Sequence, residues 1–285
     1  MFNQLKEIII TNQASELELG ITRSLNITTM AGKATICMGV RRCGKSTYMR
    51  QLLNDLLKQG VKRENTVHIN FFDNRLHNLQ HSNLEIILEA YYAIYPDKKN
   101  SQKVYFFFDE IQEIEGWETF VERIIRAEKS EVYITGSSAK MLSKEIATQM
   151  RGRSLSWEIF PFSLAEYLNY KNINFAINMT SKDRLLVQHG FSEYLVTGGF
   201  PEVAKLPQHL RIKIHQEYFN TILFRDLIER HNIKNPQAVI DLAYWLINNI
   251  SSTYTLNSLT GYIKSLGHKI TKAKIREYLD WFEDS

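Results

Sequence analysis

One segment constrains the fold of this chain more than any other: a glycine-rich turn between an apolar stretch and an amphipathic one. Residues 39–46 have the spacing G-x-x-x-x-G-K-[ST], follow a predicted strand and open a predicted helix. In that context the backbone N–H groups turn inward and the helix presents the positive end of its dipole, so the loop binds phosphate. The predicted nucleotide-binding residues are Gly39, Val40, Arg41, Arg42, Cys43, Gly44, Lys45, Ser46 and Thr47.

Two side chains of this P-loop are expected to do chemistry. Lys45 reaches the outer phosphates of the nucleotide, and the Ser46 hydroxyl binds Mg²⁺. ATP with Mg²⁺ is therefore the predicted ligand, and no guanine-specific N-K-x-D motif occurs at the expected place. A chance glycine-rich turn is the alternative, and the matching strand, helix and acidic motif disfavour it.

A second motif is an apolar strand that ends in two adjacent carboxylates, Asp109 and Glu110. Asp109 is expected to hold Mg²⁺ through its water shell, because that ion keeps several waters and uses few protein carboxylates. Glu110 is expected to polarise the attacking water, since phosphoryl transfer needs a positioned nucleophile. Without the P-loop, two solvated acids after a core strand would be the simpler interpretation.

A third motif supplies a polar residue at the end of another apolar strand. Ser137 is the preferred candidate for a side chain between the two carboxylates and the γ-phosphate, with Ser138 next. The alternative is that one of these serines caps the helix predicted to follow.

Three arginines are candidates for contact with the γ-phosphate, where a guanidinium stabilises the charge of the transition state, often across a subunit boundary. Arg153 is preferred to Arg151, because it directly precedes a predicted strand. A surface salt bridge is the competing role for both. Arg225 lies in a charged helical tract, 224–230, for which the solvent-exposed face of a long helix is the favoured interpretation.

Arg41 and Arg42 are unusual inside a P-loop. Three roles are open to them: phosphate contact, pairing with an acidic group such as Glu202, or exposure to solvent. The structural pairing is ranked slightly ahead of the other two.

Between residues 34 and 160, short apolar runs alternate with amphipathic stretches, which is the pattern of a parallel sheet covered by helices on both faces. The predicted strands are residues 34–38, 66–72, 103–108, 131–135 and 155–160. Helices are predicted at 46–59 and 117–126 from their apolar spacing. The fold class is therefore α/β, with a five-stranded parallel sheet of the P-loop NTPase type.

Beyond Pro161 the strand signal fades and helices follow. They are predicted at residues 164–170, 183–196, 209–230, 237–250, 257–266 and 271–282. The last two have the spacing of a helix-turn-helix and predict a partial winged helix without its wing. The expected domains are a P-loop ATPase domain at 1–175, a helical lid-like domain at 176–250 and a partial winged-helix segment at 251–285.

Composition narrows the class further. No apolar run approaches the length of a membrane-spanning helix, and the N-terminus lacks the features of a secretory signal, so we expect a cytoplasmic protein without membrane contact. The only two cysteines, Cys37 and Cys43, are expected to be reduced apolar fillers. The net charge of +4 only weakly favours an anionic partner.

Taken together, these motifs resemble a group of predicted bacterial and archaeal ATPases of the AAA superfamily, in which a P-loop domain precedes a C-terminal domain of uncharacterised function. The residues that carry the resemblance are 39–47, 107–112, 134–138, 151–153 and 194–202. The resemblance implies an AAA-type ATPase module with Lys45, Ser46, Asp109, Glu110, Ser137 and an arginine of 151–153 at the expected positions. In that group a nuclease-like domain follows the winged helix, so the resemblance leads us to expect that this sequence is truncated at its C-terminal end.

The leading functional hypothesis is a Mg²⁺-dependent ATPase whose cycle moves the helical domain, as a monomer or a homo-oligomer, on an unknown client. A nucleotide-gated DNA-binding protein is the runner-up, and a protein client of the winged-helix segment is a further option. The DNA hypothesis rests on a basic cluster in the last two helices: Lys264, Lys269, Lys272, Lys274 and Arg276. Nearby acids offset that charge. An ATP-binding scaffold without turnover is the third hypothesis.

Overall fold

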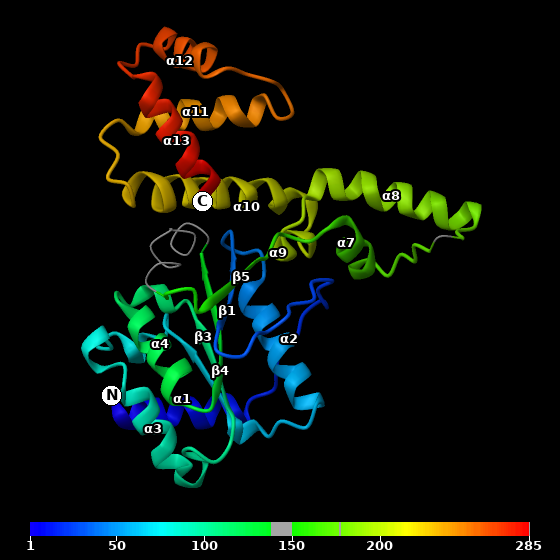
Figure 1. Cartoon of the computed structure of the whole chain (residues 1–285). Helices are drawn as coiled ribbons and strands as arrows, with labels where there is room; N and C mark the ends of the chain where they lie inside the picture. The colour runs from blue at the N-terminus through cyan, green and yellow to red at the C-terminus, as the bar shows by residue number, and fades with distance from the viewer. Residues whose placement is uncertain (138–149, 177, 285) are drawn as a thin grey trace. The chain divides into compact units, whose positions relative to one another are not determined.

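Five parallel strands form a single sheet in the order β2-β3-β4-β1-β5 in the computed structural model, which describes residues 1–137, 150–176 and 178–284 (Figure 1). The strands are β1 (Ala34–Gly39), β2 (Thr66–Asn70), β3 (Val104–Asp109), β4 (Ser130–Ser137) and β5 (Ser154–Glu158). Contacts divide the chain into two compact units, Met1–Leu206 and Pro207–Ser285, and the sheet lies in the first.

The strand register gathers the ends of four strands at one edge of the sheet. Gly39 at the end of β1 lies opposite Ser137 of β4, and Asn70 at the end of β2 lies opposite Asp109 of β3. Because all strands run in the same direction, the side chains and loops that follow them meet at this carboxyl edge, where open α/β sheets bind their ligands.

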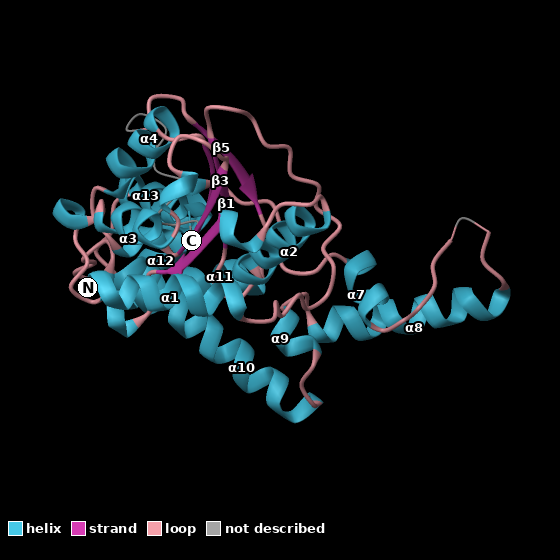
Figure 2. Ribbon diagram, turned by 90° about the horizontal axis from the view of Figure 1, so that it is seen from below, coloured by secondary structure: helices cyan, strands magenta, loops and turns pink. Residues whose placement is uncertain are grey.

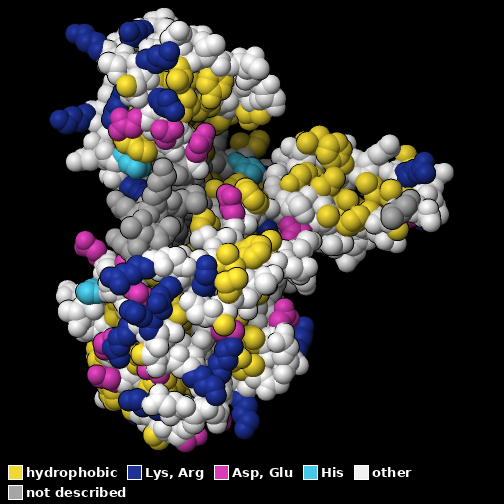
Figure 3. Space-filling view, in the orientation of Figure 1, with side chains coloured by type: hydrophobic (Ala, Val, Ile, Leu, Met, Phe, Trp, Pro, Cys, Tyr) yellow, Lys and Arg dark blue, Asp and Glu magenta, His cyan; other side chains and the backbone are white. Residues whose placement is uncertain are grey.

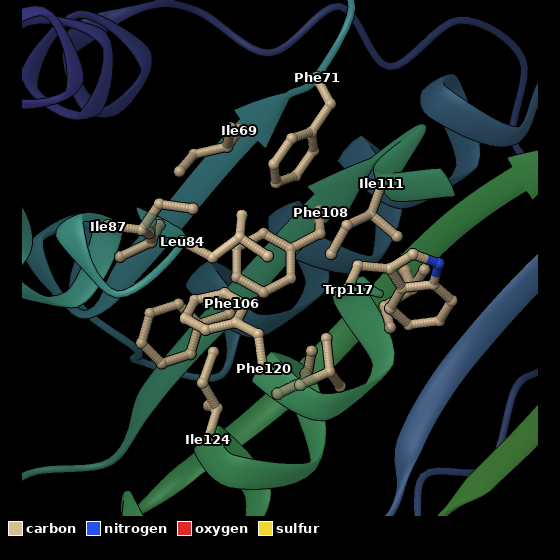
Figure 4. Packing of buried hydrophobic residues seen from close by; sticks show 14 of the residues in the cluster. Ile69, Phe71, Leu84, Ile87, Phe106, Phe108, Ile111, Trp117, Phe120 and Ile124 are labelled. Atoms are coloured by element: carbon tan, nitrogen blue, oxygen red, sulfur yellow. The ribbon is translucent and has the colours of Figure 1, made fainter. Parts of the chain in front are cut away.

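Helices cover both faces of the sheet, because successive strand residues point to opposite sides. Phe106 and Phe108 of β3 face a core built with α1 (Phe2–Ala14), α3 (Ile86–Ile94) and α4 (Trp117–Ala127) (Figure 4). Phe107, between them, faces α2 (Lys45–Lys58) and stacks on Tyr133 with ring centroids 4.7 Å apart. The strands are therefore buried on both sides, as their near-continuous apolar sequences predict.

The predicted α/β class and all five strands are confirmed, with small differences at the ends. β2 stops at Asn70 instead of residue 72, because the Asn70 side chain accepts a hydrogen bond from the Phe72 N–H and turns the chain. Two helices of the core were not predicted. They are α1 and α3, which bury Leu5, Ile8, Ile9, Ile87, Leu88 and Tyr91.

After β5 the first unit continues with α7 (Leu164–Tyr170), α8 (Ser181–Thr197) and the short α9 (Pro201–Ala204). Capping boxes start α7 and α8, where Ser163 and Thr180 each accept a hydrogen bond from the third residue of the helix. Several large apolar side chains of α8 are exposed along the helix (Figure 3). They are Leu185, Leu186, Phe191, Leu195 and Val196.

The regular elements described in the second unit are all helices, joined by turns and loops, whereas the strands belong to the first unit (Figure 2). Its elements are α10 (Gln208–Thr221), a π-helical stretch (Ile222–Glu229), α11 (Pro236–Asn248), α12 (Leu256–Ser265) and α13 (Lys272–Asp284). They enclose their own core, which includes Leu227, Leu242, Leu259, Ile263 and Ile275. The helical C-terminal region is confirmed, and the winged helix stays a prediction.

Within the described residues, no helix combines the length and the apolar character that crossing a bilayer requires.

The aromatic core of β3 sets the stability of the first unit. Phe106 is fully buried between α3 and α4, so Phe106→Ala removes packed volume that the neighbours cannot refill and should lower the free energy of unfolding by about 3–5 kcal/mol. Urea titration followed by circular dichroism measures it. Phe160→Ala, at a side chain that is 63% exposed, is the control and should change stability by less than about 0.5 kcal/mol. Equal losses in the two variants would contradict this account of the core.

Candidate functional site

The P-loop leaves β1 through a glycine that no other residue can replace without displacement. Gly39 has φ 153°, and a Cβ at this position would lie 2.1 Å from the carbonyl oxygen of Ile159. Gly44, at φ 101°, forms the N-cap of α2, and helix α2 begins at Lys45. The two glycines of the motif therefore hold the loop close against the chain after β5 and aim the start of α2 at the loop's interior.

Arg42 is a non-glycine residue in the left-handed region, with φ 65°. Such a conformation is uncommon for a side chain of this size and tends to occur where neighbouring structure imposes it. The Arg42 guanidinium forms an ion pair with Glu202 at 3.3 Å. The structural pairing, which was ranked ahead of phosphate contact and solvent exposure, is therefore confirmed for Arg42.

Lys45 is only 5% exposed, and its ammonium lies inside the loop. It donates hydrogen bonds to the carbonyl oxygens of Gly39 at 2.9 Å and Val40 at 3.0 Å. Both acceptors are neutral carbonyl oxygens. A phosphate anion would bind the Lys45 ammonium more strongly and would therefore compete with them. Ser46, one residue on, donates its hydroxyl to Oδ1 of Asp109 at 3.0 Å.

The end of β3 brings the two predicted carboxylates to the same place. Asp109 is 3% exposed and accepts hydrogen bonds from Ser46 and from the Thr135 hydroxyl. The chain then turns sharply: Glu110 adopts a left-handed conformation, with φ 57° and ψ 40°. Its N–H donates to the Thr135 hydroxyl at 3.1 Å, and its carboxylate accepts a hydrogen bond from Gln112.

The hydroxyl of Thr135, in β4, thus bridges the Asp109 carboxylate and the backbone N–H of Glu110. The role predicted for Ser137, two residues further along, is a different one: a polar side chain between the carboxylates and the γ-phosphate, and it stays a prediction. The register sets Ser137 opposite Gly39 of the P-loop, and Ser138 lies outside the described residues. The available signal in the sequence was a threonine directly after the run from Val132 to Ile134, and in the structure Thr135 is fully buried.

Arg151 and Arg153 lie at the other end of the sheet from the P-loop. Arg153 precedes β5, and its carbonyl oxygen accepts a hydrogen bond from the N–H of Ala34, at the start of β1. Its guanidinium is 3.7 Å from a carboxylate oxygen of Glu122, the surface salt bridge weighed as its competing role. Neither arginine lines the cleft at the carboxyl edge. Arg225 lies in the π-helical stretch of the second unit.

The P-loop and the two acids line a cleft of about 650 Å³ in the first unit. Glu202, the predicted partner of the loop arginines, also lines it, and four residues that the sequence did not single out complete its walls: Asn70, Phe72, Pro201 and Lys205. Pro201 also approaches the loop itself, because a Cβ on Gly44 would lie 3.7 Å from the Pro201 ring. Helix α9 and the residue after it are thus part of this site, although more than 150 residues separate them from the P-loop in sequence.

The Arg23 side chain binds the P-loop, and the sequence around Arg23 contains no motif that predicts this contact. Its side chain is 7% exposed and pairs with Glu166 at 2.9 Å. The same guanidinium donates to the carbonyl oxygens of Cys43, at 2.9 Å, and of Phe160. Glu166 also accepts hydrogen bonds from the N–H groups of Ser24 and Ser163. A buried arginine therefore joins the loop to the start of α7.

The two cysteines behave as apolar fillers, as expected. Cys37 and Cys43 are free thiols, buried in one cluster with Tyr48 and Ile159 beneath the loop. Burial raises the pKa of Cys37 to about 12, and burial also raises the pKa of Cys43, although Lys45 and Arg23 oppose that rise. Neither thiol is thereby poised to react.

The oxygens at the carboxyl edge suit a hard divalent cation. The Ser46 hydroxyl and the Asp109 carboxylate are hydrogen-bonded neighbours, and Mg²⁺ prefers such oxygen ligands and few of them. Among the described residues, no group of three or more His, Cys, Asp or Glu side chains could surround a metal ion. The donor set therefore fits an ion that keeps most of its water shell.

Residues 31–168 match the family model of an AAA domain, and residues 188–285 match the model of a domain of unknown function. Residues 31–168 thus form an AAA domain that carries the phosphate-binding loop, and a domain of unknown function follows it. The resemblance inferred from the motifs is confirmed.

Two relatives that match most of this chain are uncharacterised proteins. An uncharacterised protein of Methanocaldococcus jannaschii is 33% identical over 98% of this chain and 61% of its own length. An uncharacterised protein of Haemophilus influenzae is 30% identical over 88% of this chain and 60% of its own length. The chain thus spans about three fifths of these relatives.

Solved structures give a weaker likeness. AMPPCP-bound DnaA from Aquifex aeolicus aligns over 92% of this chain and 74% of its own, with 11% identity and a TM-score of 0.38. The Aeropyrum pernix ORC1 protein in complex with DNA aligns over 99% and 81%, with 11% identity and a TM-score of 0.36. Scores this low carry no argument about ligands or partners.

The buried Glu166 carboxylate should make the stability of the first unit depend on pH. Burial raises its pKa, but hydrogen bonds from Ser24 and Ser163 and the Arg23 guanidinium outweigh burial and hold the pKa below its ordinary value. A carboxyl with a lowered pKa stabilises the fold above its unfolded-state pKa, and that stabilisation is lost as the pH falls through the folded value. We expect Glu166→Gln to lower the free energy of unfolding by roughly 2 kcal/mol at pH 7.

Urea titrations of both proteins across a pH series measure this difference, which should shrink as the pH falls below about 4.3. Glu193→Gln is the control, because Glu193 forms a more exposed ion pair with Lys171 and should contribute at most about 1 kcal/mol. A Glu166→Gln effect of the same size at acid and neutral pH would rule out a charge-dependent role.

Proposed function

We propose that this protein binds ATP with Mg²⁺ in the cleft at the carboxyl edge of the sheet and hydrolyses it. The observation that carries the proposal is the convergence of four predicted side chains on that cleft: Lys45, Ser46, Asp109 and Glu110 all line it. They come from two loops that are more than 60 residues apart in sequence. A chance glycine-rich turn would not be expected to meet an acidic pair in this way.

The phosphates are expected to lie over the P-loop at the start of α2. There the backbone N–H groups and the helix dipole favour an anion, and the Lys45 ammonium exchanges two carbonyl oxygens for the more strongly basic phosphate oxygens. Ser46 and Asp109 would hold Mg²⁺, which, when bound, neutralises part of the phosphate charge. Lys205, which also lines the cleft, has no carboxylate partner among the described residues and adds a further cation.

The base of the nucleotide is assigned to a smaller cavity beside Gly44 and Thr47. Its apolar walls are Ile21, Phe162 and Pro201, and a flat, weakly polar ring packs favourably against such side chains. Thr47 follows Ser46 directly, so a nucleotide with its phosphates on the loop would direct its sugar and base toward this cavity. The site would therefore enclose the nucleotide from phosphate to base within the first unit.

Glu110 is assigned the role of general base. Its carboxylate would accept a proton from the water that attacks the γ-phosphorus, while the bond to the bridging oxygen breaks and ADP leaves. Thr135 and Gln112 hold Glu110 at the backbone and at the carboxylate, so the base is kept in place. Ser137 remains a proposed additional contact to the γ-phosphate.

Arg153 and Arg151 are assigned to a neighbouring molecule. Each lies at the amino edge of the sheet, and β1, with its six residues, separates that edge from the P-loop by about 16 Å. Their guanidinium groups therefore fit a role in trans, in a homo-oligomer, better than a role in their own cleft. Movement of the helical part on an unknown client, in the cytoplasm, completes the proposal.

Phosphate release tests the enzyme hypothesis. We expect the purified chain to hydrolyse ATP in the presence of Mg²⁺. Lys45→Ala should lower the rate of hydrolysis by about 100-fold or more, because the phosphates lose a positioned cation. Glu110→Gln should lose turnover to a similar extent but retain ATP binding. Nucleotide binding is measured in parallel with a fluorescent ATP analogue. Tight binding without turnover at every protein concentration would instead support an ATP-binding scaffold, and absence of binding would refute both.

A second candidate function, DNA binding, is favoured by the charge around α13. Lys269, Lys272 and Arg276 are exposed at the turn and the first turns of that helix, as is Lys264 on α12, and Figure 3 shows Lys and Arg side chains gathered on this unit. Lys274 differs from them, because it pairs with Glu277 at 2.9 Å and lies over the Trp281 ring. Phosphate contact is thus assigned to the exposed cations.

The triple variant Lys269→Ala, Lys272→Ala, Arg276→Ala should weaken binding to duplex DNA by at least about tenfold and flatten its salt dependence by roughly one unit of slope for each lost phosphate contact. Fluorescence anisotropy over a salt series measures both quantities. Lys213→Ala, which removes an exposed charge from α10, is the control and should bind as the unaltered protein does. An unchanged slope in the triple variant would exclude α13 as the DNA contact.

A further inference from the structure

Helix α9 is anchored firmly on one side, through the loop that precedes it. The Gly199 carbonyl accepts a hydrogen bond from the N–H of Phe162 at 2.6 Å, and a Cβ at Gly199 would lie 2.5 Å from the Phe162 carbonyl oxygen. The Phe162 carbonyl also accepts a hydrogen bond from the Tyr194 hydroxyl at 2.6 Å. Val203 and Ala204 are buried. The loop before α9 therefore packs tightly on the chain after β5.

On its other side, α9 approaches the P-loop through Pro201, near Gly44, and through the ion pair of Glu202 with Arg42. Glu202 lies 3.3 Å from the Arg42 guanidinium, and the two side chains are 48% and 63% exposed. Exposed pairs of this kind stabilise a protein by at most about 1 kcal/mol. This contact is consequently easy to exchange for a stronger one, in contrast to the buried pair of Arg23 and Glu166.

A ligand in the cleft could replace Glu202 as the partner of Arg42, because both side chains line the cleft. The lining cations are Arg41, Arg42, Lys45 and Lys205, and the lining carboxylates are Asp109, Glu110 and Glu202. A polyphosphate in the cleft carries the same sign of charge as Glu202 and offers Arg42 several oxygens in a geometry that suits a guanidinium. One guanidinium cannot serve both anions equally well.

We propose that Glu202 competes with the polyphosphate for Arg42, so that nucleotide binding breaks the ion pair and loosens α9 from the P-loop. This inference rests on the proposed nucleotide binding and adds a response to it. Glu202 acts here as a positioning residue, and it holds α9 against the loop only while the cleft lacks phosphate. The chain passes directly from α9 into the second unit after Leu206, so the attachment that changes is the one next to that junction.

A double-mutant cycle on nucleotide affinity tests the competition. Glu202→Gln should tighten the binding of a fluorescent, non-hydrolysable ATP analogue by about two- to fivefold, which corresponds to the range of an exposed ion pair. The same change in an Arg42→Asn background should have no effect, because asparagine tolerates the left-handed backbone but leaves Glu202 without its guanidinium. Glu193→Gln, which removes a carboxylate outside the cleft, is the matched control and should leave affinity unchanged.

Equal tightening by Glu202→Gln in both backgrounds would overturn the proposal, since it would show a general charge effect instead of an exchange at Arg42. No tightening in either background would overturn it as well. Both results require that the analogue binds, so they leave the proposed function intact. If neither the unaltered chain nor any variant binds nucleotide, the proposed function fails, and this inference fails with it.

Hydrogen exchange supplies a readout that a charge effect alone would not move. The N–H groups of Ala204, Lys205 and Leu206 are bonded to the carbonyls of Phe200, Glu202 and Val203. Saturating analogue should speed exchange across residues 201–206 in the unaltered chain, while Glu202→Gln should exchange fast with or without it. Slower or unchanged exchange in the nucleotide-bound, unaltered chain would refute the loosening of α9.

Discussion

The buried contact between Arg23 and Glu166 is the interaction on which the geometry of the site depends. A P-loop is a strained turn whose carbonyl and N–H groups cannot all pair with one another, so other parts of the chain must hold it. Arg23 does so by donating to the Cys43 carbonyl inside the loop and to the Phe160 carbonyl beyond β5. Glu166 neutralises that guanidinium and at the same time caps α7. One buried pair thus joins the P-loop, the chain after β5 and the start of α7.

The parallel sheet brings the P-loop and the acidic pair together, and this arrangement can be predicted from the sequence. Each strand is a short, nearly continuous apolar run, and parallel strands must end at the same edge. The P-loop and the Asp109–Glu110 pair therefore meet because of where they stand in their strands. Two helices of the same core escape such reasoning. Ile8, Ile9 and Ile10 form a short β-branched run whose periodicity fits a strand as well as a helix, and α3 is apolar on nearly every side.

Several contacts that build the site join residues that lie far apart in the sequence. Arg23 pairs with a glutamate 143 positions away, and Arg42 pairs with one 160 positions away. No local spacing encodes such pairs, although the acidic residue at 202 was a correct guess for Arg42. Thr135 was missed for another reason. It stands inside the strand, where polar residues are easily taken for filler, and only the register between β3 and β4 reveals that its hydroxyl serves both Asp109 and the Glu110 backbone.

Two arginine–glutamate pairs therefore touch the same loop with opposite physical character. The pair of Arg23 and Glu166 is 7% and 5% exposed, and removing either partner would strand a buried charge, so this contact persists whatever fills the cleft. The pair of Arg42 and Glu202 lies in solvent, where its attraction is weak and the loss of one partner is tolerated. A binding loop needs both properties. It must keep its shape in order to present backbone N–H groups to phosphate, and a neighbouring element must be able to change its attachment if occupancy of the cleft is to be felt elsewhere in the chain. The buried pair of Arg23 and Glu166 keeps the shape of the loop. The exposed pair of Arg42 and Glu202 is weak enough to change when the cleft is occupied.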